Sequence, residues 1–277
     1  MLTEEQKERR KNGIGASDSP IIMGYSSFKT PYELYLEKKG VLEQTEESEL
    51  QKWGNKLEPV IIDHFAEVNN MEVTFPDTIY HPEYPFIFAN LDGFCKKENA
   101  VVEAKMANSF MKKMWDKALE DGIPNAYLIQ IAKQVALADA DVGYCAVLIG
   151  GFEYMQFTYQ RDKELEEFII ESDKRFWHCV QNNIEPEPMN VNDCKLKYRD
   201  SSAEDVVVAT KSVEEYINRM LQLKGQQKQL VEIENKSKMK IMDFMKEKEV
   251  LEDTEGKTLA TWKKSKKGNR IFNLKGQ

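Results

Sequence analysis

The sequence has few of the features that mark membrane, secreted or zinc-binding proteins. Its 277 residues contain no run of about eighteen apolar residues, and the start MLTEE lacks the basic and apolar segments of a signal peptide. The cysteines have no C-x-x-C spacing, and the histidines are not paired at ligand spacing. These residues are Cys95, Cys145, Cys179 and Cys194, and His64, His81 and His178. Their pattern predicts a protein that stays inside the cell, has no membrane partner, keeps its thiols reduced and uses neither zinc nor a histidine nucleophile.

Internal repeats and low-complexity segments are also absent, and a formal net charge of −8 is unusual for a protein that binds DNA. The distribution of charge matters more than its sum. Acidic residues cluster at 43–49 and 164–171, whereas basic residues gather at 7–11, at 112–113 and at the C-terminal end. Residues 236–277 contain twelve Lys or Arg and six Asp or Glu, a net charge of +6. This end could bind DNA or a partner, while the pair at 112–113 could equally be a solvated face.

Two short apolar runs carry two carboxylates and one amine. Asp92 ends the first run, and Glu103 and Lys105 lie two residues apart on the second, so strand periodicity places Glu103 and Lys105 on one face. Hard oxygen ligands of this kind hold Mg²⁺, and an adjacent ammonium can orient or deprotonate a metal-bound water. The pattern is typical of phosphodiester hydrolysis. The alternative interpretation is a solvated hairpin whose charged residues pair on its surface.

Two upstream segments add candidate residues. Glu58 lies in a segment with helical apolar spacing, where it could lean over a sheet to bind a second metal or fix a water ligand, or could simply be a surface residue. The glycine-rich turn from Gly13 to Ser17 precedes a short helix whose N–H groups and dipole would favour a phosphate. Its other interpretation is an ordinary N-cap, with Pro20 in the first helical turn.

The order of these motifs resembles the YqaJ-like viral recombinase family, which includes the lambda-type exonuclease within the PD-(D/E)XK nucleases. Members have an arginine seven positions before a serine, then a W-G-x-x-x-E element, a D-G turn, an E-x-K element and a tyrosine-led helix with glutamines. The resemblance covers about residues 8 to 180. The matching residues in chain order are Arg10, Ser17, Trp53, Gly54, Glu58, Asp92, Gly93, Glu103, Lys105, Tyr127 and Gln130.

The resemblance implies a restriction-endonuclease-like core and a role for each matching residue. Asp92 and Glu103 would bind Mg²⁺, or Mn²⁺ in its place, with help from the Ala104 carbonyl, and Lys105 would serve the attacking water. Glu58 would complete the catalytic set. Two further residues would hold the terminal 5′-phosphate of a DNA strand, namely Arg10 and Ser17.

The sequence departs from the family pattern at two positions. Asn90 stands before the acidic turn where a serine is frequent, and Ala132 replaces the second glutamine of the family helix. Gln130 therefore carries the polar role alone, or Gln134 shares it, and the sequence leaves both readings open.

The resemblance also implies a function. The protein would be a Mg²⁺-dependent 5′–3′ double-stranded DNA exonuclease that resects DNA ends to 3′ single-stranded overhangs. These overhangs would serve phage-type homologous recombination by strand annealing in a bacterial host cell. A ring-shaped homo-oligomer and a single-strand annealing protein as partner would accompany it. The residues alone supply only metal-assisted hydrolysis, so a Cas4-like or restriction-type endonuclease and a non-catalytic DNA-binding adaptor remain as rivals.

The expected fold class is α/β (α+β), a central mixed sheet flanked by helices. The expected domains are a nuclease core over 1–185, a linker over 186–210 and a helical arm with a basic β-hairpin over 211–277. The arm could be one long helix or two, and Trp262 in the hairpin could stack a base or form a small core. Expected helices cover 3–12, 17–24, 31–40, 48–69, 108–120, 124–139 and 162–182, and expected strands 72–81, 86–91, 100–105, 143–149 and 152–159.

Overall fold

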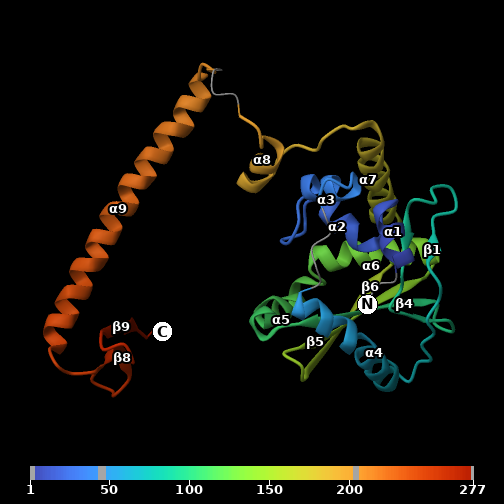
Figure 1. Ribbon diagram of the computed structural model, residues 1–277. Coiled ribbons are helices and arrows are strands. Elements are labelled where there is room, and N and C mark those ends of the chain that lie inside the picture. Colours follow the sequence, from blue (N-terminus) through green and yellow to red (C-terminus); the bar gives the residue numbers. More distant parts are fainter. Residues whose placement is uncertain (1–3, 43–47, 202–205, 276–277) are drawn as a thin grey trace. The chain divides into compact units, whose positions relative to one another are not determined.

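The computed structural model describes residues 4–42, 48–201 and 206–275, the side chains of residues 4–7 excepted. The chain divides into two compact units, Met1–Ser201 and Ser202–Gln277, and each is described by itself. Figure 1 labels most of the helices and several of the strands of both units. No helix among the described residues is long and apolar enough to cross a membrane.

A four-stranded mixed sheet forms the centre of the first unit, in the order β3 (Gly93–Cys95), β4 (Ala100–Ala107), β5 (Val142–Ile149) and β6 (Glu153–Gln160). β4 and β5 are parallel, and the outer two pairings are antiparallel. A parallel pair needs a crossover, which α5 (Lys112–Asp121) and α6 (Asn125–Ala138) supply. The expected class, a mixed sheet flanked by helices, is confirmed.

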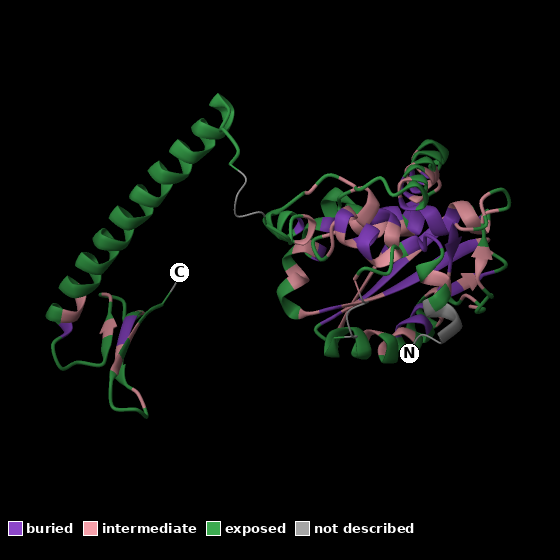
Figure 2. Ribbon diagram, turned by 45° about the horizontal axis from the view of Figure 1, so that its top comes forward, coloured by how far each residue is buried: buried purple, intermediate pink, exposed green. Residues whose placement is uncertain are grey.

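Helices cover both faces of this sheet (Figures 1 and 2). One face packs on α4 (Glu49–Asn69) through Ile61, Ile62 and Phe65. The other face packs on α5, α6 and α7 (Lys163–Asn182), with the fully buried Trp115 in that layer. Residues alternate between the faces, so Val102 and Ala104 lie toward α4 while Val101 and the odd-numbered residues after it lie toward α6.

A glycine sets the spacing between β5 and α6. Gly143 lies on the α6 face of the sheet, and a Cβ built there would overlap the side chain of Ile131 and lie 3.0 Å from Val135. Any larger residue would therefore force the helix away from the strand. The close packing of these two layers depends on that missing side chain.

The N-terminal segment contains α1 (Glu4–Lys11), a 3₁₀ turn η1 (Ala16–Asp18), α2 (Ser19–Ile22) and α3 (Pro31–Lys38). The expectation that Ser17 caps a helix is wrong, because Ser17 lies inside η1 and Asp18 holds the N-cap position of α2. α2 has only four residues, too few for a substantial helix dipole. In α3, Thr30 and Glu33 form a capping box ahead of a buried aromatic and aliphatic stripe.

The region that precedes Asp92 is less regular than expected. The strand predicted over 72–81 is reduced to β1 (Ile79–Tyr80), which pairs with β2 (Phe88–Ala89) away from the main sheet. An isolated bridge joins Thr74 to Phe94. β3 was not predicted, because a three-residue strand starting at a glycine resembles a turn.

The segment predicted as a linker, 186–210, contains the short helix α8 (Val191–Lys197). The Asn190 side chain caps it, and the fully buried Asp193 accepts a hydrogen bond of 2.9 Å from the Thr30 hydroxyl at the start of α3. Prolines and polar residues suggested an irregular tract, but this contact fixes α8 on the first unit.

The second unit contains one continuous helix, α9 (Lys211–Met245), followed by a three-stranded antiparallel sheet. The alternative of two helices is therefore excluded. The strands are β7 (Val250–Glu252), β8 (Thr258–Lys264) and β9 (Arg270–Leu274), and the predicted hairpin is β8 with β9. Most of α9 is exposed, and Met245 is its buried residue where the strands begin (Figure 2).

Candidate active site

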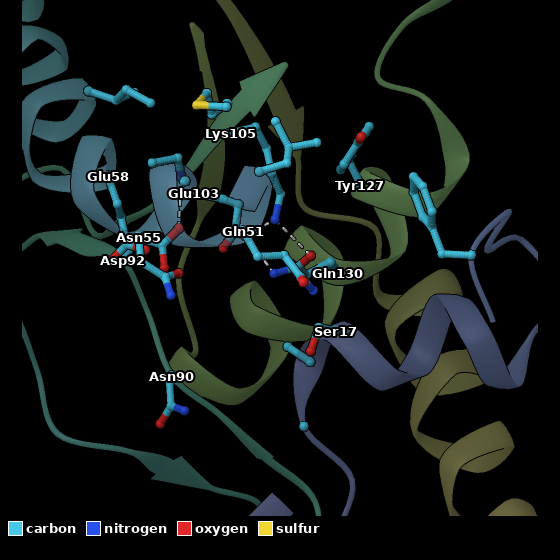
Figure 3. Close-up of a pocket in the computed structure, with 18 of the residues that line it drawn as sticks. Ser17, Gln51, Asn55, Glu58, Asn90, Asp92, Glu103, Lys105, Tyr127 and Gln130 are labelled. Atoms are coloured by element: carbon cyan, nitrogen blue, oxygen red, sulfur yellow. Dashed lines mark hydrogen bonds and ion pairs between the residues drawn. The ribbon is translucent and has the colours of Figure 1, made fainter. Parts of the chain in front are cut away.

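One cavity of about 550 Å³ lies at the edge of β4, beyond the residue at which β3 begins. Figure 3 shows Lys105, Gln130 and Tyr127 on one side of it, and Asp92, Asn55 and Glu58 on the other. The sequence-predicted residues that line it are Arg10, Ser17, Glu58, Asp92, Glu103, Ala104, Lys105 and Gln130. Residues that are far apart in the sequence are thus brought to one place.

The two predicted metal-binding carboxylates enter the cavity from adjacent segments. Asp92 immediately precedes β3, and its Oδ2 accepts a hydrogen bond of 2.9 Å from the Ala104 N–H on β4. In a strand, the N–H and C=O of one residue point to the same side, so the Ala104 carbonyl faces this open edge as well. Glu103, the neighbouring residue on β4, is almost fully buried and lines the same cavity.

The Glu103 carboxylate is held by three side chains. Lys105 Nζ and Gln130 Nε2 each donate to Oε1 at 2.5 Å, and Gln134 Nε2 donates to Oε2 at 2.6 Å. The shared face predicted for Glu103 and Lys105 is confirmed. Both candidate glutamines contact Glu103, because they lie one helical turn apart on α6, whose face packs on the sheet.

Lys105 is fixed from more than one side. Its Nζ donates to Gln130 Oε1 at 3.1 Å as well as to Glu103, and it lies 5.7 Å from the centre of the Tyr127 ring. Burial lowers the pKa of Lys105, but the Glu103 and Asp92 carboxylates outweigh this effect and raise it above its ordinary value. In this arrangement Lys105 is an ammonium aimed into the cavity.

The carboxylates repel one another in this partly buried position. Burial raises the pKa of Asp92 well above its ordinary value, and the nearby Glu103 carboxylate adds to the rise. Burial also raises the pKa of Glu58, again with a contribution from Glu103. A cation placed among these groups would offset their repulsion.

The donor set fits a magnesium ion. Among the described residues, no group of three or more His, Cys, Asp or Glu side chains is arranged to hold a metal. Glu58 therefore lines the cavity without joining Asp92 and Glu103 in such a group. Two carboxylates and the Ala104 carbonyl match Mg²⁺, which keeps several waters and takes substrate phosphate oxygens as further ligands. These three residues would hold it.

The N-terminal candidates, Arg10 and Ser17, also line the cavity. Arg10 lies in the last turn of α1, and Ser17 is exposed. Lys38 Nζ donates to the Arg10 carbonyl at 2.5 Å and to Asp18 Oδ2 at 2.7 Å, which fixes this segment to α3. A cation and a hydroxyl are thus available for an anion.

Sequence reasoning missed one buried cation behind this segment. Lys133 of α6 is completely buried, donates to the carbonyls of Ile14 and Gly15 at 3.0 Å, and pairs with Asp173 of α7. The sequence does contain an indication of this buried lysine, because Lys133 lies among the apolar residues of α6 that face the core. Trp53, in contrast, is half exposed and does not line the cavity, although the adjacent Gly54 does.

The mixed sheet flanked by helices is a fold that this chain shares with solved exonuclease structures. The alkaline exonuclease LHK-Exo from Laribacter hongkongensis has this fold, with a TM-score of 0.55 and 21% identity over 66% of this chain and 94% of that one. LHK-Exo in complex with dAMP matches at a TM-score of 0.55 and 20% identity, over 71% of this chain and 98% of that one.

The sequence comparisons define the family more narrowly. The family model described as the YqaJ-like viral recombinase domain matches residues 5–141. The uncharacterized protein YqaJ of Bacillus subtilis (strain 168) is 30% identical over 256 residues, which are 88% of this chain and 79% of that protein. The chain belongs to the YqaJ-like viral recombinase family.

Proposed function

We propose that the protein is a Mg²⁺-dependent exonuclease that acts on double-stranded DNA ends. It degrades the 5′-ended strand and leaves 3′ overhangs for recombination by strand annealing. The observation that carries this proposal is the convergence of Asp92, Glu103 and Lys105 in one cavity with Arg10 and Ser17. The name of the family and the exonuclease activity of LHK-Exo, which shares the fold, support it.

Each residue of the cavity has a part in this reaction. Asp92, Glu103 and the Ala104 carbonyl would hold a Mg²⁺ ion, which when bound would supply Lewis-acid chemistry at the scissile phosphate and the attacking water. Gln130 and Gln134 hold the Glu103 carboxylate in position.

Lys105 acts beside the metal-binding residues. Its Nζ is anchored by Glu103 and Gln130, so it orients the attacking water and stabilises negative charge that develops on the phosphate. Glu58 on α4 lines the cavity across from Lys105 (Figure 3), where it would fix a water ligand.

Arg10 and Ser17 bind the terminal phosphate of the 5′-ended strand. A guanidinium presents a fork of donors that matches phosphate oxygens, and the exposed Ser17 hydroxyl adds a further donor. A terminal phosphate carries more charge than an internal one, so this part of the cavity selects DNA ends.

The enzyme acts in the cytoplasm of a bacterial cell and is encoded by a phage or prophage. It forms a ring-shaped homo-oligomer and works together with a single-strand annealing protein. Encirclement would keep the enzyme on DNA between successive cleavages.

A direct test uses linear 5′-phosphorylated duplex labelled at either end, with Mg²⁺, with Mn²⁺ and with EDTA. We expect nucleotides to be released from the 5′-ended strands, no release in EDTA, and an intact closed circular control. Cutting of the closed circle would favour a Cas4-like or restriction-type endonuclease. Binding without cleavage under every metal condition would favour the adaptor interpretation.

A further inference from the structure

The end of β8 and the turn that joins it to β9 carry four lysines, which we call the lysine tip. The turn is closed by hydrogen bonds from Ser265 N–H to the Asn269 carbonyl at 2.8 Å and from Gly268 N–H to the Ser265 carbonyl at 3.0 Å. Gly268 has a φ of +92°, which suits glycine. The lysine tip consists of Lys263, Lys264, Lys266 and Lys267, all exposed.

The lysine tip is not neutralised within the described part of the chain. None of its four ammonium groups forms an ion pair with a described carboxylate, whereas Lys29, Lys38, Lys112 and Lys133 of the first unit all do. Four like charges at one end of the hairpin repel one another. Within a chain of net charge −8, this concentration is suited to an anionic partner.

The adjacent Arg270 has a different role, because it holds the tip in place. Its guanidinium lies 3.6 Å from the centre of the Trp262 ring and donates to the carbonyls of Lys246 and Lys248 at 2.7 Å each. Its Nε also donates to the Trp262 carbonyl at 3.0 Å. The end of α9 and both strands are thereby joined, so the lysines extend from a fixed base.

We propose that the lysine tip, none of whose residues lines the catalytic cavity, binds the sugar-phosphate backbone of duplex DNA. This inference rests on the proposed function, which makes DNA the substrate. Lysine is a hydrated, flexible point charge, suited to phosphates without sequence preference. Single-strand binding would need free aromatic surfaces, but the Trp262 ring is covered by Arg270 and the Phe272 ring carries Lys238.

The test compares two lysine pairs of equal charge on two hairpin turns. The full-length variant Lys266→Gln with Lys267→Gln removes half of the tip. The control, Lys96→Gln with Lys97→Gln, changes the exposed turn between β3 and β4. Binding of each protein to a 5′-phosphorylated duplex is measured in EDTA, which prevents cleavage, over a series of salt concentrations.

We expect the tip variant to bind about five- to tenfold more weakly at low salt, with a log Kd against log salt slope smaller by about 2. The control should keep the slope of the unaltered protein. An unchanged slope in the tip variant, or equal losses in both variants, would overturn the proposal. A larger loss for a single strand of equal length than for the duplex would overturn the assignment to duplex.

Failure of the lysine-tip proposal and failure of the proposed nuclease function give different experimental results. Nucleotide release by the unaltered protein with Mg²⁺ tests the nuclease, and the salt slope in EDTA tests the tip. If release fails while the slopes differ as expected, the nuclease proposal fails and the DNA-binding surface stands. If release succeeds while the slopes coincide, only the surface is lost.

Discussion

Lys133 and Asp173 form an ion pair that is completely buried, with 2.6 Å between Lys133 Nζ and Asp173 Oδ2. The Ser19 hydroxyl also donates to Asp173 Oδ2, at 2.9 Å. Burial lowers the pKa of Lys133 despite the nearby Asp173 carboxylate, and burial raises the pKa of Asp173. The pair joins α6 and α7 to the carbonyls of Ile14 and Gly15, so it fixes the segment that carries Ser17.

Lys133→Met should destabilise the protein by about 3–5 kcal/mol, because it leaves Asp173 buried without a partner. Urea unfolding followed by circular dichroism measures the change in free energy of unfolding. Adding Asp173→Leu should recover much of the loss. Lys117→Met is the control, since the exposed Lys117–Asp121 pair should contribute less than about 1 kcal/mol. Similar losses in both lysine variants would contradict the prediction.

Lys105→Ala should reduce nucleotide release from linear duplex by at least about 100-fold, because the ammonium that orients water and offsets phosphate charge is removed. DNA binding in EDTA should persist, which separates chemistry from binding. Single-turnover rates with Mg²⁺ provide the measurement. A variant that cleaves at the normal rate would show that the role assigned to Lys105 is wrong.

Arg10→Ala should remove the preference for 5′-phosphorylated ends, because a guanidinium binds a terminal phosphate through paired charge-assisted hydrogen bonds. The ratio of cleavage rates on 5′-phosphate and 5′-hydroxyl duplexes should fall by about tenfold, equivalent to about 1.4 kcal/mol. Arg10→Lys should restore the charge but only part of the preference. If the ratio is the same in all three proteins, Arg10 does not select the end.

Acid should remove the contribution of the Asp18–Lys38 pair to stability. Burial would raise the pKa of Asp18, but Lys38 outweighs burial and holds the pKa below its ordinary value of 3.8. The unfolded chain therefore binds the proton more tightly, so the stabilisation is present above about pH 4 and is lost as pH falls below that. The stability difference between the unaltered protein and Asp18→Asn, measured in urea, should shrink from pH 7 to pH 3. A difference that stays constant would contradict the assignment.

The carboxylate and amine of β4 could be predicted from sequence because their geometry is local. Glu103 and Lys105 share a face whenever the segment is a strand, and strand periodicity alone establishes this. Asp92 could also be predicted to lie near them, because the segment that it ends is close to β4 in the sequence. The resemblance, through the order of its motifs, added Arg10 and Ser17, which the structure places in the same cavity.

What sequence could not predict depends on contacts between distant segments. The choice between Gln130 and Gln134 required the position of α6 over β4, where both amides reach Glu103. The burial of Lys133 required three segments to meet. α8 was hidden because its fixed position depends on a hydrogen bond between Asp193 and Thr30, 163 residues away in the sequence.

The missing side chain at Gly143 has a consequence for how this enzyme could be altered. An amide on α6 reaches the Glu103 carboxylate only while the helix rests directly on β5. Gly143→Ala, far from any reacting atom, would lift the helix and lengthen both amide contacts together. This position therefore admits no methyl group without loosening the hydrogen bonds at the centre of the site.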